Sequence, residues 1–475
     1  MSQLFLNQCG IVCALGNDVA TVRQRLLDDA ASGLSWTSEF SPPVIAQISA
    51  PAESTTMPAD PTGKATLIGA NALANASVSA CPATITVATT TATVPALQLP
   101  LGRVQADLPS MAHWPLAMQS RNNQLALAAL AQIRPALDVA IAQYGSERVA
   151  VVIGTSTSGI DRTEHAMGEQ VQHQALPPEF HYAQQEMGSV AEMLATELGV
   201  SGPAYVHSSA CSSSAKAIAS AARLLRMGLV DAVLTGGVDT LCRFTVAGFS
   251  ALESVSKTPC QPMSANRNGI NIGEAAALFL LTREPGPVAL LGWGESSDGH
   301  HMSAPDPAGH GARLAMQQAL DKAGLTPQQI DYINLHGTAT IQNDAMESRV
   351  VAELFGLDVP CSSTKPFTGH TLGAAAAVEA AFCWIALQDD AGRWPPHLWD
   401  GARDAALPHL NLVAAVHGNN TRIPAAATTP VNATNSTTPA ISTHAASATG
   451  KRRIALSNSF AFGGSNACLI FGSAP

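Results

Sequence analysis

Charged and aromatic side chains are scarce in this sequence. Over 475 residues, Asp, Glu, Lys and Arg together make up 13% and aromatic residues 5%, and the formal net charge is −10. Because nucleic acid phosphates attract an excess of lysine and arginine, this balance argues against a nucleic-acid-binding protein. No uninterrupted apolar run reaches the roughly 20 residues of a bilayer span, and the N-terminal segment lacks the basic start of a signal peptide. We therefore expect a cytoplasmic protein without a membrane span.

Closely spaced pairs of cysteines are absent from the sequence as well. The nine cysteines are scattered and none belongs to a C-x-x-C motif, which argues against a disulfide framework and against a zinc site. We expect no bound metal. What the chain has in abundance is apolar residues, at 46%, and this excess over charged residues favours an oligomer that covers part of the surface.

Strands alternate with helices along most of the sequence. Residues 148–156, for example, form an apolar strand pattern, and 211–228 have the composition of a helix. Long apolar strands separated by helices predict an α/β fold with mostly parallel and mixed sheets, covered by helices on both faces. Two stretches, about 36–115 and 421–450, are instead rich in Ala, Thr, Ser and Pro. We expect these to be exposed insertions without catalytic residues.

Cys211 lies among small residues in VHSSACSSSAKA (206–217), between an expected strand and an expected helix. Unpaired N–H groups and the helix dipole at a helix N-terminus favour a thiolate and can bind an oxyanion. Most cysteines are simply buried as small hydrophobic residues, so the strand-to-helix turn is what distinguishes this one. Cys211 is the candidate nucleophile for the covalent transfer of an acyl group.

Two histidines each follow an expected strand. His336 opens the segment HGTAT, and His370 ends the segment KPFTGH. A lone histidine after a strand is more often structural than catalytic. However, ligands of α/β sheets bind beyond the carboxyl ends of the strands, so we expect both imidazoles and Cys211 to meet at one site.

Charged residues accompany the histidines. Lys365 stands five residues before His370, at the end of an expected strand. Asp344 and Glu347 are three residues apart on an expected helix and therefore share a face. We expect one of these two carboxylates to pair with Lys365.

Four blocks of sequence together resemble the β-ketoacyl synthase family of condensing enzymes. They are ACSSSAKA (210–217), NLHGTAT (334–340), SSTKPFTGHTLGAA (362–375) and NSFAFGGSNACLIF (458–471). The blocks occur in the order typical of the family, and the similarity extends over most of the chain except the two biased stretches. The resemblance implies a thiolase-like fold with layers α-β-α-β-α and two similar halves, 1–285 and 286–475.

The resemblance also implies a catalytic set. Cys211 matches the nucleophile that takes an acyl chain from an acyl carrier protein. His336 and His370 match the histidines that assist decarboxylation of the malonyl group on its carrier. Lys365 matches a supporting lysine, and Glu347 its ion-pair partner.

Substrate contacts and partners follow from the same resemblance. Thr338 and Thr340 match threonines that contact the phosphopantetheine arm, which the acyl carrier protein delivers, so no cofactor of the enzyme's own is implied. Phe462 matches a gating residue whose N–H completes an oxyanion hole with that of Cys211. A homodimer, or a heterodimer with a homologous synthase or chain-length-factor subunit, is expected. Basic residues near the pocket are candidates for docking the acidic carrier: Lys216, Arg223 and Arg226.

Some positions depart from the family pattern. Ala461 stands where glycine is usual, and Ser465 stands where threonine is usual. The residues of the motifs most resemble those of synthases associated with aryl-polyene pigments. Two alternatives stay open: a non-catalytic subunit similar to a chain-length factor, which typically lacks the cysteine, and a thiolase, which uses a second cysteine as base.

Overall fold

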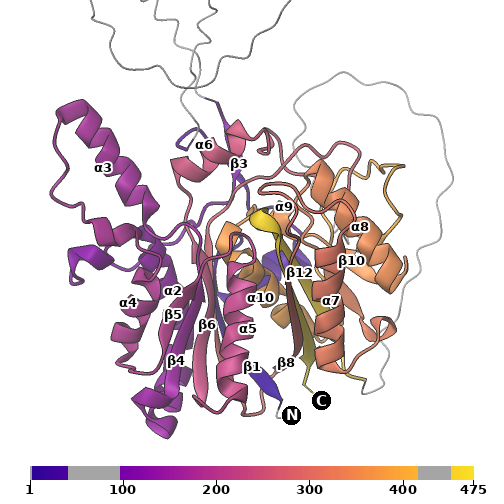
Figure 1. Cartoon of the computed structure of the whole chain (residues 1–475), viewed down its shortest axis with the longest axis horizontal. Coiled ribbons are helices and arrows are strands. Elements are labelled where there is room, and N and C mark those ends of the chain that lie inside the picture. Colours follow the sequence, from indigo (N-terminus) through magenta and orange to yellow (C-terminus); the bar gives the residue numbers. More distant parts are fainter. Residues whose placement is uncertain (1–2, 41–96, 416–450, 475) are drawn as a thin grey trace, which may run out of the picture. The chain divides into compact units, whose positions relative to one another are not determined.

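The computed structural model describes residues 3–40, 97–415 and 451–474 (Figure 1). Residues 41–96 of the first expected insertion lie outside these ranges, as does all of the second, 421–450. The helices are α1 (Val19–Arg23), α2 (Arg121–Tyr144), α3 (Ile160–His173), α4 (Ser189–Leu198), α5 (Ser213–Arg226), α6 (Arg243–Ala251), α7 (His310–Ala323), α8 (Ile341–Phe355), α9 (Lys365–Thr368) and α10 (Ala375–Leu387), with short turns η6 (Leu372–Ala374) and η7 (Phe462–Gly464) near the end of the fold. The strands are β1 (Leu4–Val12), β2 (Ser35–Thr37), β3 (Leu99–Leu101), β4 (Val149–Gly154), β5 (Ala204–His207), β6 (Ala232–Asp239), β7 (Ala275–Thr282), β8 (Val288–Ser297), β9 (Tyr332–Asn334), β10 (Pro360–Ser362), β11 (Asn411–Leu412), β12 (Ile454–Ala461) and β13 (Ser465–Ser473).

The same strand order occurs twice in the main sheet. Its 11 strands run β11-β10-β9-β12-β13-β8-β1-β7-β6-β4-β5, and the two sides join where Leu4–Leu6 of β1 pairs with Val288–Leu290 of β8. Outward from this junction, one side reads β1-β7-β6-β4-β5 and the other β8-β13-β12-β9-β10, with β11 added at its outer edge. Each set of five strands has two antiparallel ladders followed by two parallel ones, and β11 adds a further parallel ladder. The predicted α/β fold with two similar halves is confirmed, and the sheet is mixed.

Helices lie between the two halves and outside them (Figure 1). In the middle, α5 and α10 pack against each other and against strands of both halves. On the outer faces, α2 and α4 cover one half, and α7 covers the other with α8 beside it. Three clusters of buried apolar residues fill the central layer and the two outer interfaces. This is the predicted α-β-α-β-α layering.

The composition of α10 explains why a helix fits in the centre. Its sequence AAAVEAAFCWIAL is almost entirely buried, and small alanines let neighbouring elements approach closely. Just before it, a Cβ on Gly373 would lie 2.7 Å from the backbone N of Ser156. Close packing at this point requires glycine.

Helix α2 is, among the described residues, the one helix long and apolar enough to cross a bilayer by length and composition alone. Its residues Leu125, Leu130 and Ile133 are buried in the apolar cluster beneath β1 and β7. A buried core helix passes the same test, so this property is weak support for a membrane span.

Candidate active site

Cys211 lies on a tight turn between β5 and α5. The preceding residue, Ala210, has a φ of 51°, a conformation that costs roughly 1–3 kcal/mol for a residue with a Cβ. Ser213 compensates in part, because its Oγ donates to the Ala210 carbonyl at 2.6 Å and accepts from the Ser209 N–H at 2.9 Å. The turn leaves the Cys211 side chain buried, with 4% of the residue exposed.

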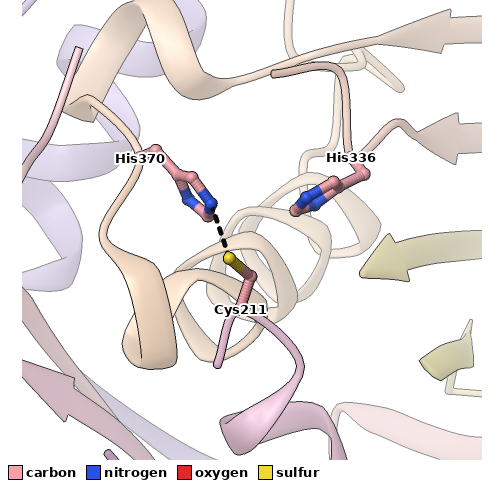
Figure 2. Close-up of side chains that lie close together, drawn as sticks. All are labelled: Cys211, His336 and His370. Carbon is pink, nitrogen blue, oxygen red and sulfur yellow. Dashed lines mark hydrogen bonds between the residues drawn. The ribbon is translucent and has the colours of Figure 1, made fainter. Parts of the chain in front are cut away.

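His370 comes from the loop between α9 and η6 and points at the sulfur (Figure 2). Its Nε2 lies 3.0 Å from Cys211 Sγ. The backbone N–H of His370 donates to the Asn271 carbonyl at 2.6 Å, which fixes the loop against the first half. Within the described residues, the buried Nδ1 of His370 has no hydrogen-bond partner.

His336 follows β9 and points toward the same space from the other side (Figure 2). Its ring centroid lies 5.3 Å from that of His370, at an interplanar angle of 82°. The Nζ of Lys365 lies 3.4 Å from His336 Nδ1. Because an ammonium can only donate, Nδ1 accepts this hydrogen bond and Nε2 carries the ring hydrogen. His336 is therefore a hydrogen-bond donor through Nε2.

Burial dominates the protonation of all three groups. It lowers the pKa of His336 and of His370 well below 6.5, and the Lys365 charge lowers both further, so both imidazoles are neutral at pH 7. Burial also raises the pKa of Cys211 to about 12, against the opposing effects of Lys365 and the Phe462 N–H. Desolvation thus opposes the thiolate that a position near a helix N-terminus was expected to favour. Cys211 rests as a thiol.

The expected partners of Lys365 are wrong. Its Nζ pairs with Glu379 Oε1 at 2.5 Å, and both side chains are buried. Sequence reasoning missed Glu379, although it carries the one charge in α10. A carboxylate on such an apolar helix is buried and needs a cation as its partner in the interior. The single glutamate of α10 was therefore the sequence feature that could have predicted the pair with Lys365.

Glu347 and Asp344 support loops instead. The two oxygens of Glu347 accept the backbone N–H groups of His336 and Gly337, each at 2.7 Å. Glu347 therefore shapes the loop that carries His336. Asp344 Oδ2 accepts the N–H of Met263 at 2.8 Å, on the segment beside this loop.

A pocket that is open to solvent leads to the sulfur. Thr338 and Thr340 line it, with their hydroxyls 2.9 Å apart. Phe462 also lines it and packs its ring against Phe249 at a centroid distance of 5.4 Å. The structure thus brings all three predicted substrate-contact residues to one pocket with Cys211, and their contact with a substrate stays a prediction.

The basic residues predicted to dock a carrier are placed differently. Arg223 pairs with Glu295, and the guanidinium of Arg226 lies over the ring of Trp293 at 4.3 Å. At 1.5 Å per residue, Arg223 stands about 18 Å along α5 from the nucleophile, and neither arginine lines the pocket. Arg223 and Arg226 therefore have partners within the chain, and a docking role for them stays a prediction.

The thiol and the two imidazoles could also hold a divalent metal ion. One ligand atom from each of Cys211, His336 and His370 lies within 4.8 Å of the others, a donor set that zinc accepts. The Lys365 ammonium, 3.4 Å from His336 Nδ1, opposes a second positive charge at this place.

Two family models together match more than half of the chain. Residues 117–285 match the β-ketoacyl synthase N-terminal domain, and residues 288–398 match the β-ketoacyl synthase C-terminal domain. A 3-oxoacyl-[acyl-carrier-protein] synthase 2 of Rhizobium meliloti (strain 1021) is 36% identical over 291 residues, which cover 57% of this chain and 60% of the relative. The synthase 2 of Staphylococcus aureus is 27% identical over 369 residues, 74% of this chain and 83% of that protein.

Solved structures agree with these relatives. The ketosynthase (ApeO) in complex with its chain length factor (ApeC) from Xenorhabdus doucetiae superposes with a TM-score of 0.78 and 40% identity, covering 100% of this chain and 98% of that one. A β-ketoacyl synthase from Burkholderia phymatum STM815, at 23% identity and a TM-score of 0.71, shares the fold. With its cysteine and two histidines at one pocket and both family domains in sequence, the chain belongs to the β-ketoacyl synthase family of acyltransferases.

Proposed function

We propose that this chain catalyses the decarboxylative condensation of an acyl group held on Cys211 with a malonyl group delivered by an acyl carrier protein. One observation carries the proposal: a buried thiol faces two neutral imidazoles, and His370 Nε2 lies 3.0 Å from its sulfur. This geometry supports nucleophilic capture followed by stabilisation of a developing negative charge.

The first half-reaction transfers the acyl chain. The Cys211 sulfur attacks the carbonyl carbon of an acyl thioester, its proton passes by way of His370 to the departing carrier thiol, and the old carbon–sulfur bond breaks. Burial raises the pKa of Cys211 to about 12, so the proton leaves during attack rather than before it. The backbone N–H groups of Cys211 and Phe462 are suited to the oxyanion.

The second half-reaction forms the carbon–carbon bond. The malonyl carboxylate leaves as carbon dioxide, and the electron pair moves into the thioester as an enolate. His336 donates through Nε2 to the enolate oxygen, and His370 is placed to do the same. The enolate carbon then attacks the acyl carbon, the carbon–sulfur bond to Cys211 breaks, and the departing thiolate takes up a proton from solvent. The protein residues suffice for each step.

Partners and subfamily belong to the same proposal. We assign contact with the phosphopantetheine arm of the carrier to Thr338, Thr340 and Phe462, because they line the pocket. The 40% identity to a ketosynthase solved with its chain length factor supports a heterodimer with a homologous subunit, and agrees with the aryl-polyene branch predicted from the motifs. We place the protein in the cytoplasm and divide it into halves at residues 285 and 286.

The two alternatives are less well supported. A chain-length-factor-like subunit has no use for the intact set of Cys211, His336 and His370. A thiolase needs a second cysteine beside the nucleophile, but Cys361 and Cys468 are buried in the outer apolar cluster and do not line the pocket.

Intact-protein mass spectrometry with an acyl carrier protein tests the function. The wild-type chain, with any partner subunit, should gain one acyl mass and then yield a β-ketoacyl carrier when malonyl carrier is added. Cys211→Ala should do neither, whereas Cys361→Ala, a buried control outside the pocket, should do both. Wild-type product formation by Cys211→Ala would falsify the proposal.

A further inference from the structure

The turn η7 carries Phe462, which lines the pocket together with Cys211, and its backbone N–H lowers the pKa of the Cys211 thiol against the effect of burial. On its outer side, this turn is held by the loop that follows β8. The Gly463 N–H donates to the Met302 carbonyl at 2.7 Å, and the Asp298 N–H donates to the Gly464 carbonyl at 2.8 Å. These contacts fix η7 against the second half but not against the helix that carries the nucleophile.

A polar cluster at Ser465 makes the connection to that helix. Ser465 ends the turn and begins β13. Its Oγ lies 3.0 Å from Ser212 Oγ and 2.5 Å from Lys216 Nζ. Ser212 is the residue next to the nucleophile, and Lys216 lies in the first turns of α5. The serine hydroxyl therefore joins the end of η7 to the start of the nucleophile helix.

Lys216 is an unusual donor for this contact. The residue is half-buried, and burial lowers its pKa. Among the described residues, Lys216 forms no ion pair, and its Nζ donates to Ser465 Oγ. Desolvating an ammonium without a counter-charge costs stability, so a role in the site accounts for its presence better than a role in folding.

We propose that Lys216 is a positioning residue: through Ser465 it fixes the Phe462 N–H at the distance from Cys211 that an oxyanion requires. This inference rests on the proposed function and deepens it. Oxyanion donors act because they are held in place before charge develops. A donor 2.5 Å from the hydroxyl that ends η7 restrains the turn from the side of the nucleophile.

The test distinguishes the effects of the Ser465 hydroxyl, of the Lys216 ammonium and of a change in net charge. Lys216→Met keeps the length of the side chain and removes its donors, and Ser465→Ala removes the acceptor. We expect each to slow acylation of Cys211 and condensation about tenfold in kcat, a fraction of the 10²–10³-fold loss of a whole oxyanion donor, with KM for the carrier substrate unchanged. Ser465→Thr, which keeps the hydroxyl, should retain the wild-type rate.

Two further variants complete the design. The double variant Lys216→Met/Ser465→Ala should be no slower than either single variant, because both remove one connection. Lys322→Met removes a positive charge from α7, away from the pocket, and should leave kcat unchanged. Additive losses in the double variant, wild-type kcat in Lys216→Met, or a changed KM alone would each overturn the inference.

Failure of the positioning role can be distinguished from failure of the proposed function. If wild-type protein takes no acyl group onto Cys211, the function is wrong. If the wild type is acylated and Lys216→Met is acylated equally fast, only the positioning role is wrong. Should Lys216→Met fold poorly, as judged by its Tm, the comparison of Ser465→Ala with Ser465→Thr decides alone.

Discussion

The buried ion pair behind His336 offers the sharpest test of the mechanism. In Glu379→Gln, the Lys365 ammonium loses the carboxylate 2.5 Å away, in a region where both side chains are almost fully buried. An unpaired charge left in the interior costs about 3–5 kcal/mol. Without the carboxylate that holds it, the Lys365 side chain is no longer fixed beside His336 Nδ1.

The consequence for catalysis is specific to one half-reaction. Without a fixed donor at Nδ1, the hydrogen of His336 is free to move from Nε2 to Nδ1, and the enolate loses a donor. We expect release of carbon dioxide from malonyl carrier to fall about 10²–10³-fold, the effect of removing one oxyanion donor. Acylation of Cys211 depends on His370 and should fall about tenfold at most. Rapid-quench mass spectrometry measures acylation, and a coupled bicarbonate assay measures decarboxylation.

A double variant separates stability from chemistry. Lys365→Met/Glu379→Leu replaces the pair by apolar side chains of similar size, which is often neutral or stabilising in protein interiors. Its free energy of unfolding should recover relative to Glu379→Gln, while decarboxylation stays slow. If folded Glu379→Gln decarboxylates at the wild-type rate, the assigned tautomer of His336 does not matter and the reasoning is refuted.

Three other measurements follow from the site and its packing. Because the pKa of Cys211 is raised to about 12, its alkylation by iodoacetamide should accelerate about tenfold per pH unit from pH 7 through pH 9; a plateau below pH 9 contradicts this. Gly373→Ala should lower the free energy of unfolding by about 1–3 kcal/mol, since its Cβ would lie 2.7 Å from Ser156 N. Gly168→Ala, with nothing within 4 Å of its Cβ, should not be destabilising. Prolonged dialysis against a chelator should leave condensation activity unchanged; loss of activity that zinc restores would instead support a metal site.

Convergence of the site was predictable from sequence because it depends on topology. Cys211, His336 and His370 each follow a strand, and the carboxyl ends of parallel strands meet at one edge of a sheet. No information on side-chain contacts is needed for that inference. The repeated strand order, β5 in one half and β10 in the other, places the cysteine turn and the lysine–histidine segment in equivalent positions.

Charge partners and protonation were not predictable in the same way. Glu347 lies on α8 and Glu379 on α10, and only the packing of these helices decides which carboxylate reaches the Lys365 side chain. The Cys211 thiol showed the same limit. Its position near a helix N-terminus is visible in the sequence, but the desolvation that raises its pKa depends on residues from both halves.

The reactive groups are divided between the repeats. Cys211 comes from the strands before residue 285, whereas both imidazoles and Lys365 come from strands after residue 288, and α5 meets α10 along the boundary. Neither repeat holds a working set of groups. Catalytic turnover therefore requires that both repeats are folded and packed together. An isolated half, or a chain whose repeats have folded without docking, should show no residual synthesis at all.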